Sequence, residues 1–398
     1  MSAPASTLGS YARSSGQPRR LVLDPWVIGI VAALLLIGLV MVASASIGIA
    51  EKETGDAFHY FVRQLRFVAL GLVAAGIGLA IPTRLWDEYS VYLMGGAFML
   101  LLIVLIPGLG YEVNGSRRWI RLGFMNFQVS EATRVMLLMY VASYAVRRAD
   151  ELRRDFKGFM VPVGVLGGAA VLLLLEPDFG AATVLLATGL AVLFLAGARV
   201  VHLLVPVVLG SLAFAILAVV SPYRLRRLTG FLDPWGDPFD SGFQLVQSLI
   251  AIGRGEWLGV GLGASVQKLF YLPEAHTDFV FAVLAEEFGF AGVLVVVTLF
   301  TLLVARALII SREAAQAGQA FQSYVAAAIG IWLGLQAFVN IGVNMGLLPT
   351  KGLTLPLLSY GGSSMLVTLG WLGVLLRIHH ETHSSGRAGV APREVRRR

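Results

Sequence analysis

The 398-residue sequence contains no cysteine and few charged residues. The absence of cysteine excludes disulfide bonds, thiol catalysis and metal sites built from thiolates. Only 14% of the residues are charged, whereas 57% are hydrophobic, and the mean hydropathy is +0.77. This balance is too apolar for a soluble protein of this length. Apolar runs recur along most of the chain, each close to the ~20 residues that cross a bilayer as a helix.

Ten apolar segments predict an all-α polytopic membrane protein with about ten transmembrane helices. The predicted spans are 25–46, 64–81, 89–106, 126–145, 159–175, 179–196, 200–220, 278–305, 322–346 and 355–377. One long periplasmic loop, about 221–277, separates the seventh and eighth spans. The 45 glycines fit a close approach of helices in lipid. No internal repeat is evident, which counts against a transporter.

The distribution of lysine and arginine predicts that both termini are cytoplasmic. The larger share of the 31 basic residues then falls in cytoplasmic segments. The net charge of +7 therefore reflects membrane orientation rather than binding of nucleic acid. We expect a disordered cytoplasmic tail at 1–24, a transmembrane domain at 25–377 and a basic cytoplasmic tail at 378–398.

The histidines on the predicted cytoplasmic side show no metal-ligand spacing with acidic residues. We expect His202, His379 and His380 to be solvated. The sequence therefore predicts no metal site built from protein ligands.

Two arginine clusters lie on the predicted outer side, where the orientation rule disfavours them. They comprise Arg117, Arg118 and Arg121 before the fourth span, and Arg224, Arg226 and Arg227 at the start of the long loop. Outward-facing arginines beside a membrane indicate a site for lipid phosphates or a pyrophosphate. The alternative is an ordinary interaction of each arginine with lipid head groups.

The segment 272–289 leads a polar, acidic entry directly into a long apolar helix. The entry contains Glu274, His276 and Asp278. An ionisable group at the mouth of a membrane helix is costly unless it is used, so Asp278 is a candidate functional residue. The alternative is an acidic residue that complements the helix dipole.

Glu131 and Arg134 are three residues apart near the outer end of the fourth span, so their side chains can pair on one helix face. A charged pair at membrane depth must face the protein interior or an aqueous cavity. It either contacts a ligand or orients the helix as an ion pair, and the sequence leaves both open. In the short turn between the fifth and sixth spans, Asp178 is predicted to cap a helix.

Polar residues also mark the last two spans. Gln336, Asn340 and Asn344 recur every four residues and form one stripe, which favours interhelical hydrogen bonds over contact with a ligand. Lys351 follows in an outer loop, and the segment 359–364 interrupts the tenth span. Broken backbone in a membrane lines a cavity or packs against protein.

Together these segments resemble the SEDS family (shape, elongation, division and sporulation), bacterial membrane glycosyltransferases that polymerise peptidoglycan glycan strands from lipid II. The matching segments occur in order over most of the membrane region: 114–120, 128–134, 176–180, 244–278 and 340–364. The segment 349–357 and the long polar N-terminal tail resemble the cell-division branch more than the elongation branch. Two positions depart from the family pattern. Val129 stands in place of a proline, and Arg134 stands in place of a lysine, which changes the geometry of that charge.

The resemblance implies that Asp278 is catalytic, as a general base that activates a sugar hydroxyl for inverting attack on a second lipid-linked substrate. The substrate-binding residues implied by the same match are Glu131, Arg134, Arg117, Arg118, Lys351, Gln267, Lys268, His276, Ser359 and Asn344. Undecaprenyl pyrophosphate leaves in this reaction. Basic residues would stabilise its charge, and a divalent cation, magnesium or manganese, is a further candidate.

The resemblance also implies location and partners. We expect a multi-pass protein of the bacterial inner membrane at the division septum. Its expected partners are lipid II, a class B penicillin-binding protein transpeptidase (FtsI-like) and other division membrane proteins of the FtsQ, FtsL and FtsB type. Two other functions stay open, a lipid II flippase and a non-catalytic division scaffold. The polar motifs cluster on the outer side, which favours polymerisation.

Overall fold

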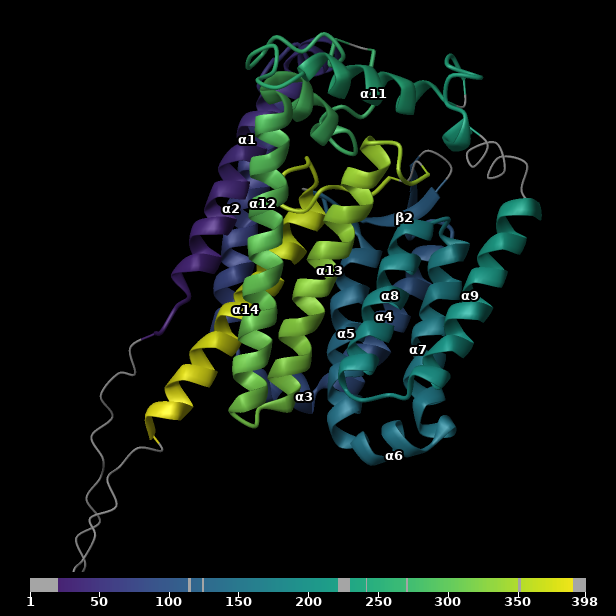
Figure 1. Ribbon diagram of the computed structural model, residues 1–398, viewed down its shortest axis with the longest axis vertical. Helices are drawn as coiled ribbons and strands as arrows, with labels where there is room; N and C mark the ends of the chain where they lie inside the picture. Colours follow the sequence, from purple (N-terminus) through teal and green to yellow (C-terminus); the bar gives the residue numbers. More distant parts are fainter. Residues whose placement is uncertain are drawn as a thin grey trace, which may run out of the picture.

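The computed structural model describes residues 21–113, 116–123, 125–220, 230–240, 242–269, 271–349 and 352–388. It is a bundle of long helices with a small β-sheet and a short helix at one end (Figure 1). We call the end that carries α11 and the sheet the loop end. The opposite end, where α1 begins and α14 ends, is the terminal end. Lys351, the cluster Arg224, Arg226 and Arg227, and residues 1–20 and 389–398 of the predicted tails lie outside the described residues.

Ten helices correspond to the ten predicted spans. They are α1 (Pro25–Thr54), α2 (His59–Ala80), α4 (Ser90–Leu105), α5 (Val129–Arg147), α7 (Phe156–Leu175), α8 (Phe179–Leu195), α9 (Val200–Val220), α12 (Val280–Gln316), α13 (Ala320–Asn344) and α14 (Gly362–Ala388). Within the described chain, six of them (α1, α2, α7, α12, α13 and α14) are long and apolar enough to cross a membrane by that criterion alone. The prediction of a polytopic helical membrane protein is confirmed.

Within the residues that the structure describes, three shorter helices lie at the two ends of the bundle. They are α3 (Thr83–Glu88) and α6 (Ala149–Arg154) at the terminal end, and α11 (Phe243–Gly255) at the loop end (Figure 1). The start of α1 and the end of α14 share the terminal end, as an even number of spans requires.

The first helix shows how local sequence sets helix ends. The Asp24 carboxylate accepts hydrogen bonds from the backbone N–H groups of Trp26 (2.9 Å) and Val27 (3.1 Å), and Pro25 occupies the first turn. Gly55 then ends α1 in the left-handed conformation, with φ of 73°. Asp24 is fully buried, and α1 begins at Pro25, the residue at which the first span is predicted to start.

Glycines bring α2 and α14 into direct backbone contact. A Cβ at Gly78 would lie 2.4 Å from the carbonyl oxygen of Gly370, and a Cβ at Gly373 would lie 2.1 Å from that of Ala75. Any side chain at either position would push the two helices apart. The predicted use of glycine for close helix approach is confirmed at this contact.

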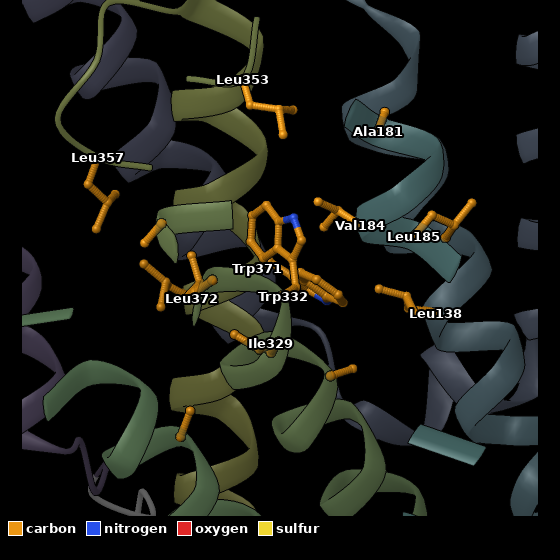
Figure 2. Close-up of a cluster of buried hydrophobic side chains, with 14 of the residues drawn as sticks. Leu138, Ala181, Val184, Leu185, Ile329, Trp332, Leu353, Leu357, Trp371 and Leu372 are labelled. Carbon is orange, nitrogen blue, oxygen red and sulfur yellow. The ribbon is translucent and has the colours of Figure 1, made fainter. Parts of the chain in front are cut away.

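The centre of the core is a pair of tryptophans. Trp332 of α13 and Trp371 of α14 have ring centroids 5.1 Å apart with an interplanar angle of 56°. Figure 2 shows that they face Leu138 of α5 and Ala181, Val184 and Leu185 of α8. This contact joins α13 and α14 to α5 and α8.

A three-stranded antiparallel sheet replaces the loop expected before the fourth span. Its strands β1 (Gly110–Val113), β2 (Ser116–Arg121) and β3 (Asn126–Gln128) are in the order β1-β2-β3. Because residues 126–128 pair with β2, helix α5 begins three residues later than predicted. The sheet is small, so the fold remains helical in character.

The last helix also differs from its prediction at both ends. Residues 355–361 form turns, so α14 begins at Gly362 rather than 355. At the other end α14 continues to Ala388, so it includes the first residues of the segment 378–398 that is predicted as a cytoplasmic tail. His379 and His380 are 6% and 8% exposed, and the expectation that they are solvated is wrong because both pack inside the terminal end.

Helix α12 is interrupted at Gly289, where φ is 62° and ψ is −161°. The loop after α11 supplies the hydrogen bonds that the break removes. The N–H of Phe290 donates to the carbonyl of Glu256 (2.9 Å), and the N–H of Val260 donates to that of Glu286 (2.9 Å). The short first segment of α12 is therefore tied to the loop that follows α11.

Candidate functional site

Asp278 lies at the loop end, directly before Phe279, the N-cap residue of α12. The amides of Asn340 and Asn344 donate hydrogen bonds to its backbone carbonyl, at 2.9 and 3.1 Å. The side-chain oxygen Oδ1 of Asn344 also accepts a hydrogen bond from the N–H of Ala282 (3.2 Å). The predicted interhelical role of this polar stripe is confirmed. Asn344 is fully buried, and its hydrogen bond to the carbonyl of Asp278 helps to position the aspartate.

The carboxylate of Asp278 is half-buried and lies against the chain just after Lys351. A Cβ added at Gly352 would lie 3.0 Å from Asp278 Oδ2. The Asn340 amide also donates to the carbonyl of Leu353 (2.5 Å). One asparagine of α13 therefore holds the aspartate and the 352–353 backbone together.

The turns before α14 pack against α2 and the Asp278 loop. The Gln64 amide of α2 donates to the carbonyl of Ser359 (3.1 Å), and the Ser359 hydroxyl accepts from the N–H of Leu355 (2.8 Å). The N–H of Tyr360 donates to the carbonyl of His276 (2.9 Å). Ser359 is buried within this frame, so the broken backbone is satisfied by protein contacts.

The imidazole of His276 is buried between two tyrosines. Its centroid lies 4.8 Å from that of Tyr60 and 5.5 Å from that of Tyr360. Burial lowers the pKa of His276, and the carboxylates of Glu274 and Glu53 oppose that shift. The ring is therefore neutral at neutral pH and adds no charge beside Asp278.

The pair Glu131 and Arg134 is buried inside the bundle, with Arg134 Nη2 3.5 Å from Glu131 Oε1. Arg134 Nη1 donates to Gln336 Oε1 (2.7 Å), and the Gln336 amide donates to the carbonyl of Thr354 (3.1 Å). The guanidinium carbon lies 5.5 Å from the Trp332 ring centroid. A chain of polar contacts thus runs from the pair to the segment that carries Gly352.

Arg118 is the sheet arginine that meets a buried acid. Asp178 caps α8 through the N–H of Ala181 (3.0 Å), which confirms its predicted role. The other carboxylate oxygen of Asp178 accepts from Gln128 (3.1 Å) and Ser130 (3.0 Å), and it lies 4.0 Å from Arg118 Nη1. Arg118 is therefore anchored where the sheet meets α5 and α8.

The other two sheet arginines have surface partners. Arg117 pairs with the exposed Glu112, at 3.1 Å. The guanidinium of Arg121 lies 3.6 Å from the centroid of the Tyr111 ring. Both remain near the surface of the loop end, where a phosphate group could reach them.

Glu176 is a candidate that the sequence interpretation passed over. Within the described part of the chain, neither oxygen of its fully buried carboxyl has a hydrogen-bond partner. Burial raises the pKa of Glu176 to about 8, with a further rise from Asp178 and an opposing effect of Arg118. Buried carboxyls of this kind cluster at functional sites. Its presence in the family segment 176–180 was the available signal.

Gln267 and Lys268 lie at the break of α12. The Lys268 ammonium donates to Glu287 Oε1 (2.7 Å) and to the Ser44 hydroxyl of α1 (2.8 Å). The backbone N–H of Gln267 donates to the carboxylate of the neighbouring Glu286 (3.4 Å). These contacts fix the loop that leads to Asp278, whereas the predicted contact with substrate stays untested.

A small apolar pocket of about 120 Å³ opens between α8 and α13, beside the 352–353 backbone. Its lining residues are Gly180, Thr183, Val184, Val339, Leu348, Pro349 and Leu353. A cavity of ~150 Å³ holds a benzene ring, so this pocket takes a short length of hydrocarbon. The carboxylate of Asp278, the basic residues of the sheet and this apolar pocket therefore all lie at the loop end.

The model of the FtsW, RodA and SpoVE family of cell cycle proteins matches residues 25–384. The chain belongs to this family. The curated relatives include the probable peptidoglycan glycosyltransferases FtsW of Thioalkalivibrio sulfidiphilus, 58% identical over 89% of each chain, and of Coxiella burnetii, 52% identical over 91% of this chain and 97% of the relative.

Solved structures agree with the family assignment. A peptidoglycan synthase complex that coordinates polymerization and crosslinking superposes with a TM-score of 0.75 at 32% identity, over 91% of this chain and 99% of the other. The rod shape determining protein RodA of Thermus thermophilus gives a TM-score of 0.68 at 31% identity, over 92% and 99%. The resemblance to the SEDS family is confirmed.

Proposed function

We propose that this protein is a peptidoglycan glycosyltransferase that polymerises lipid II, with Asp278 as general base. The observation that carries the proposal is the placement of Asp278. Two buried asparagines of α13 fix its backbone, and its carboxylate lies beside Gly352 at the loop end. The names of the curated relatives, probable peptidoglycan glycosyltransferase FtsW, support the same activity.

The carboxylate of Asp278 takes the proton from a sugar hydroxyl of the acceptor. The hydroxyl oxygen then forms a bond to the anomeric carbon of the donor. The bond from that carbon to the pyrophosphate oxygen breaks, and undecaprenyl pyrophosphate leaves with the electron pair. Attack from the opposite face converts an alpha linkage to a beta linkage. A positioned general base contributes about 10²–10⁴-fold to such a step.

The leaving pyrophosphate carries negative charge that basic residues can stabilise. Arg117 and Arg118 of β2 lie at the loop end, and Lys351 directly precedes Gly352 in the sequence. We assign the pyrophosphate to these three residues. The apolar pocket between α8 and α13 would take the first part of the lipid chain, because it adjoins Leu353.

A divalent cation would find few protein ligands at this site. In the described ranges, the single cluster of three or more suitable acidic or histidine side chains lies at the terminal end, far from Asp278 in the fold. Magnesium is bound in many enzymes by one carboxylate and substrate phosphates. Since the described residues around Asp278 form no such cluster, we assign the leaving-group charge to basic residues.

The substitution Asp278→Asn tests the proposal. It removes the base and keeps the shape, so glycan polymerisation from purified lipid II should fall by about 10²-fold or more. Glu274→Gln is the matched control, because Glu274 lies four residues earlier and is exposed. Polymerisation should survive in that variant. Near-normal glycan ladders from Asp278→Asn would refute the assignment.

A lipid II flippase is the second candidate function, and it predicts a different result. Lys351→Ala and Arg118→Ala should depress polymerisation when lipid II is supplied directly in detergent, where no transport is needed. Arg84→Ala is the control, because Arg84 is exposed on α3 at the terminal end, away from the arginines of the sheet. Wild-type polymerisation by the first two variants would refute their pyrophosphate role. A non-catalytic scaffold would give no glycan with any variant, including the unsubstituted protein.

We further propose that the partner is a class B penicillin-binding protein, FtsI-like, and that other division membrane proteins join it. The related synthase complex, which coordinates polymerization and crosslinking, supports a transpeptidase partner. The relatives named FtsW favour the division branch and the septum over elongation. With both termini cytoplasmic, the loop end faces the periplasm of the inner membrane. Copurification with the transpeptidase, and its absence with an unrelated membrane helix, would test the partner.

A further inference from the structure

The terminal end contains a cluster of side chains that the glycosyltransferase reaction does not use. His379 and His383, one turn apart on α14, stack with ring centroids 4.1 Å apart. Glu313 reaches them from α12. Its Oε2 lies 3.9 Å from His379 Nδ1 and 3.9 Å from His383 Nε2. One ligating atom from each of the three residues lies within 4.8 Å of the other two.

Hydrogen bonding fixes which atom of His383 faces the carboxylate. Its Nδ1 lies 3.0 Å from the backbone carbonyl of His379. A carbonyl can only accept, so Nδ1 carries the proton and a neutral ring presents the lone pair of Nε2 to Glu313. Two acceptors then face one another. A ligating histidine usually donates its other ring N–H to a carbonyl or carboxylate in this manner.

His379 presents a second nitrogen to the same space. The residue is 6% exposed, and its Nδ1 has no hydrogen-bond partner among the described residues; neither does Glu313 Oε2. The contacts of 3.7 to 3.9 Å are too long for hydrogen bonds. Buried polar atoms are normally satisfied, so this gap between three converging ligands indicates an ion.

The surrounding charges suit a divalent cation. Asp24 uses one carboxylate oxygen to cap α1 and the other to pair with Arg306 Nε at 2.6 Å. Arg306 Nη1 also lies 3.5 Å from Glu313 Oε1, which leaves Oε2 for the imidazoles. The net charge of the two carboxylates, the guanidinium and the two neutral rings is about −1. A divalent ion would change it to about +1, so no large net charge would be buried.

We propose that Glu313, His379 and His383 bind a divalent transition-metal ion of the zinc class. Imidazole and carboxylate ligands suit zinc, at about 2.0–2.2 Å from each ligand, which places pairs of ligands roughly 3.3 Å apart. The ligand atoms of the three side chains lie between a fraction of an ångström and about 1.5 Å farther apart than this, so small side-chain movements would bring them to the ion. The side chain of His383 is 40% exposed, so a water molecule can complete four-coordination from that side. The ion joins α12 to α14 beside the cap of α1.

Metal uptake by the full chain in detergent tests the proposal. The protein is purified on a tag without histidine, stripped with a chelator and titrated with zinc against a chromophoric competitor. We expect one tight site per chain, and cobalt(II) at that site should give visible absorption bands of a four-coordinate ion. Glu313→Gln and His383→Ala should each weaken zinc binding by 10-fold or more. Zinc should raise the unfolding temperature of the unsubstituted chain and not that of the variants.

The control is His59→Ala, which removes a histidine at the loop end and should leave zinc binding unchanged. Size-exclusion profiles identical to the unsubstituted chain show that the variants are folded, and His383 is chosen because it is partly exposed. Fewer than one tight zinc ion per chain would overturn the proposal, with a proton then bridging the cluster. The proposal would also be overturned if Glu313→Gln and His383→Ala bound zinc as tightly as the unsubstituted chain.

Discussion

Lys268 forms a buried ion pair with Glu287, and variants of this pair should show whether Lys268 binds substrate or stabilises the fold. The Glu287 side chain is fully buried and that of Lys268 is 10% exposed, with 2.7 Å between Nζ and Oε1. Ser44 of α1 bonds to both. Lys268→Met removes one charge and leaves Glu287 buried with Ser44 alone. Removing one partner of such a pair costs about 3–5 kcal/mol.

That cost is a factor of roughly 10² to 10⁴ in the folding equilibrium. Glu287→Leu should cost a similar amount because it strands the ammonium. The double substitution Lys268→Met with Glu287→Leu removes both charges. Replacing a buried pair by apolar residues is often neutral or stabilising, so the double variant should recover most of the loss. Arg254→Ala is the control, since Arg254 is 46% exposed and 3.6 Å from Glu286, and it should cost about 0–1 kcal/mol.

Two assays complete this test. Unfolding in detergent, followed by tryptophan fluorescence, measures the stability of each variant. Polymerisation of purified lipid II measures the function. If Lys268 acts only through the loop that leads to Asp278, the double variant should regain both stability and glycan synthesis. A stable double variant without activity would refute this reasoning and would return Lys268 to the substrate site.

The contacts of the Glu131–Arg134 pair, of Glu176 and of Gly78 each predict how a variant behaves. Exchanging the pair, Glu131→Arg with Arg134→Glu, should restore a buried ion pair but lose the bond to Gln336; folded protein with reduced polymerisation is expected, and full activity would reduce the pair to a structural role. The pKa of Glu176 is raised to about 8 in the folded state, whereas the unfolded carboxyl ionises near 4.5, so the stability of the protein should fall as the pH rises from 4.5 to 8. Thermal unfolding at pH 5 and pH 8 measures this fall, and it should be smaller in Glu176→Gln. Gly78→Val should cost about 1–3 kcal/mol because its Cβ would collide with Gly370, and an unchanged unfolding midpoint would contradict the contact.

The helices were predictable because the membrane requires long apolar segments, and each of the ten predicted segments has its helix. The sheet at 110–128 was not, because its arginines resemble a polar loop and its strands are short. The position of Asp278 before a helix was visible in the sequence. The support of that residue by Asn340 and Asn344 could be proposed only as general interhelical bonding, since the partner backbone is distant in the chain.

The terminal cluster shows a different limit. The spacing of His379 along the sequence indicates no metal site, because its acidic neighbour Glu313 comes from another helix. His383 completes the cluster one turn further along α14, in a segment interpreted as a tail. The family match alone assigns Lys268 to the substrate. Its ion pair with Glu287 depends on the packing of α12 against the loop, which the sequence does not show.

The break in α12 restricts how this sequence can change over evolutionary time. A Cβ at Gly255 would lie 1.9 Å from the carbonyl of Ala285, one at Gly259 would lie 2.1 Å from that of Glu287, and one at Gly289 would lie 2.4 Å from the N–H nitrogen of Gly259. Each collision is with backbone, so no neighbouring side chain can shrink to compensate. An insertion or deletion between 255 and 261 would also shift every hydrogen bond to the break. Length and composition are therefore both fixed here, in a loop whose surface position would otherwise allow free variation.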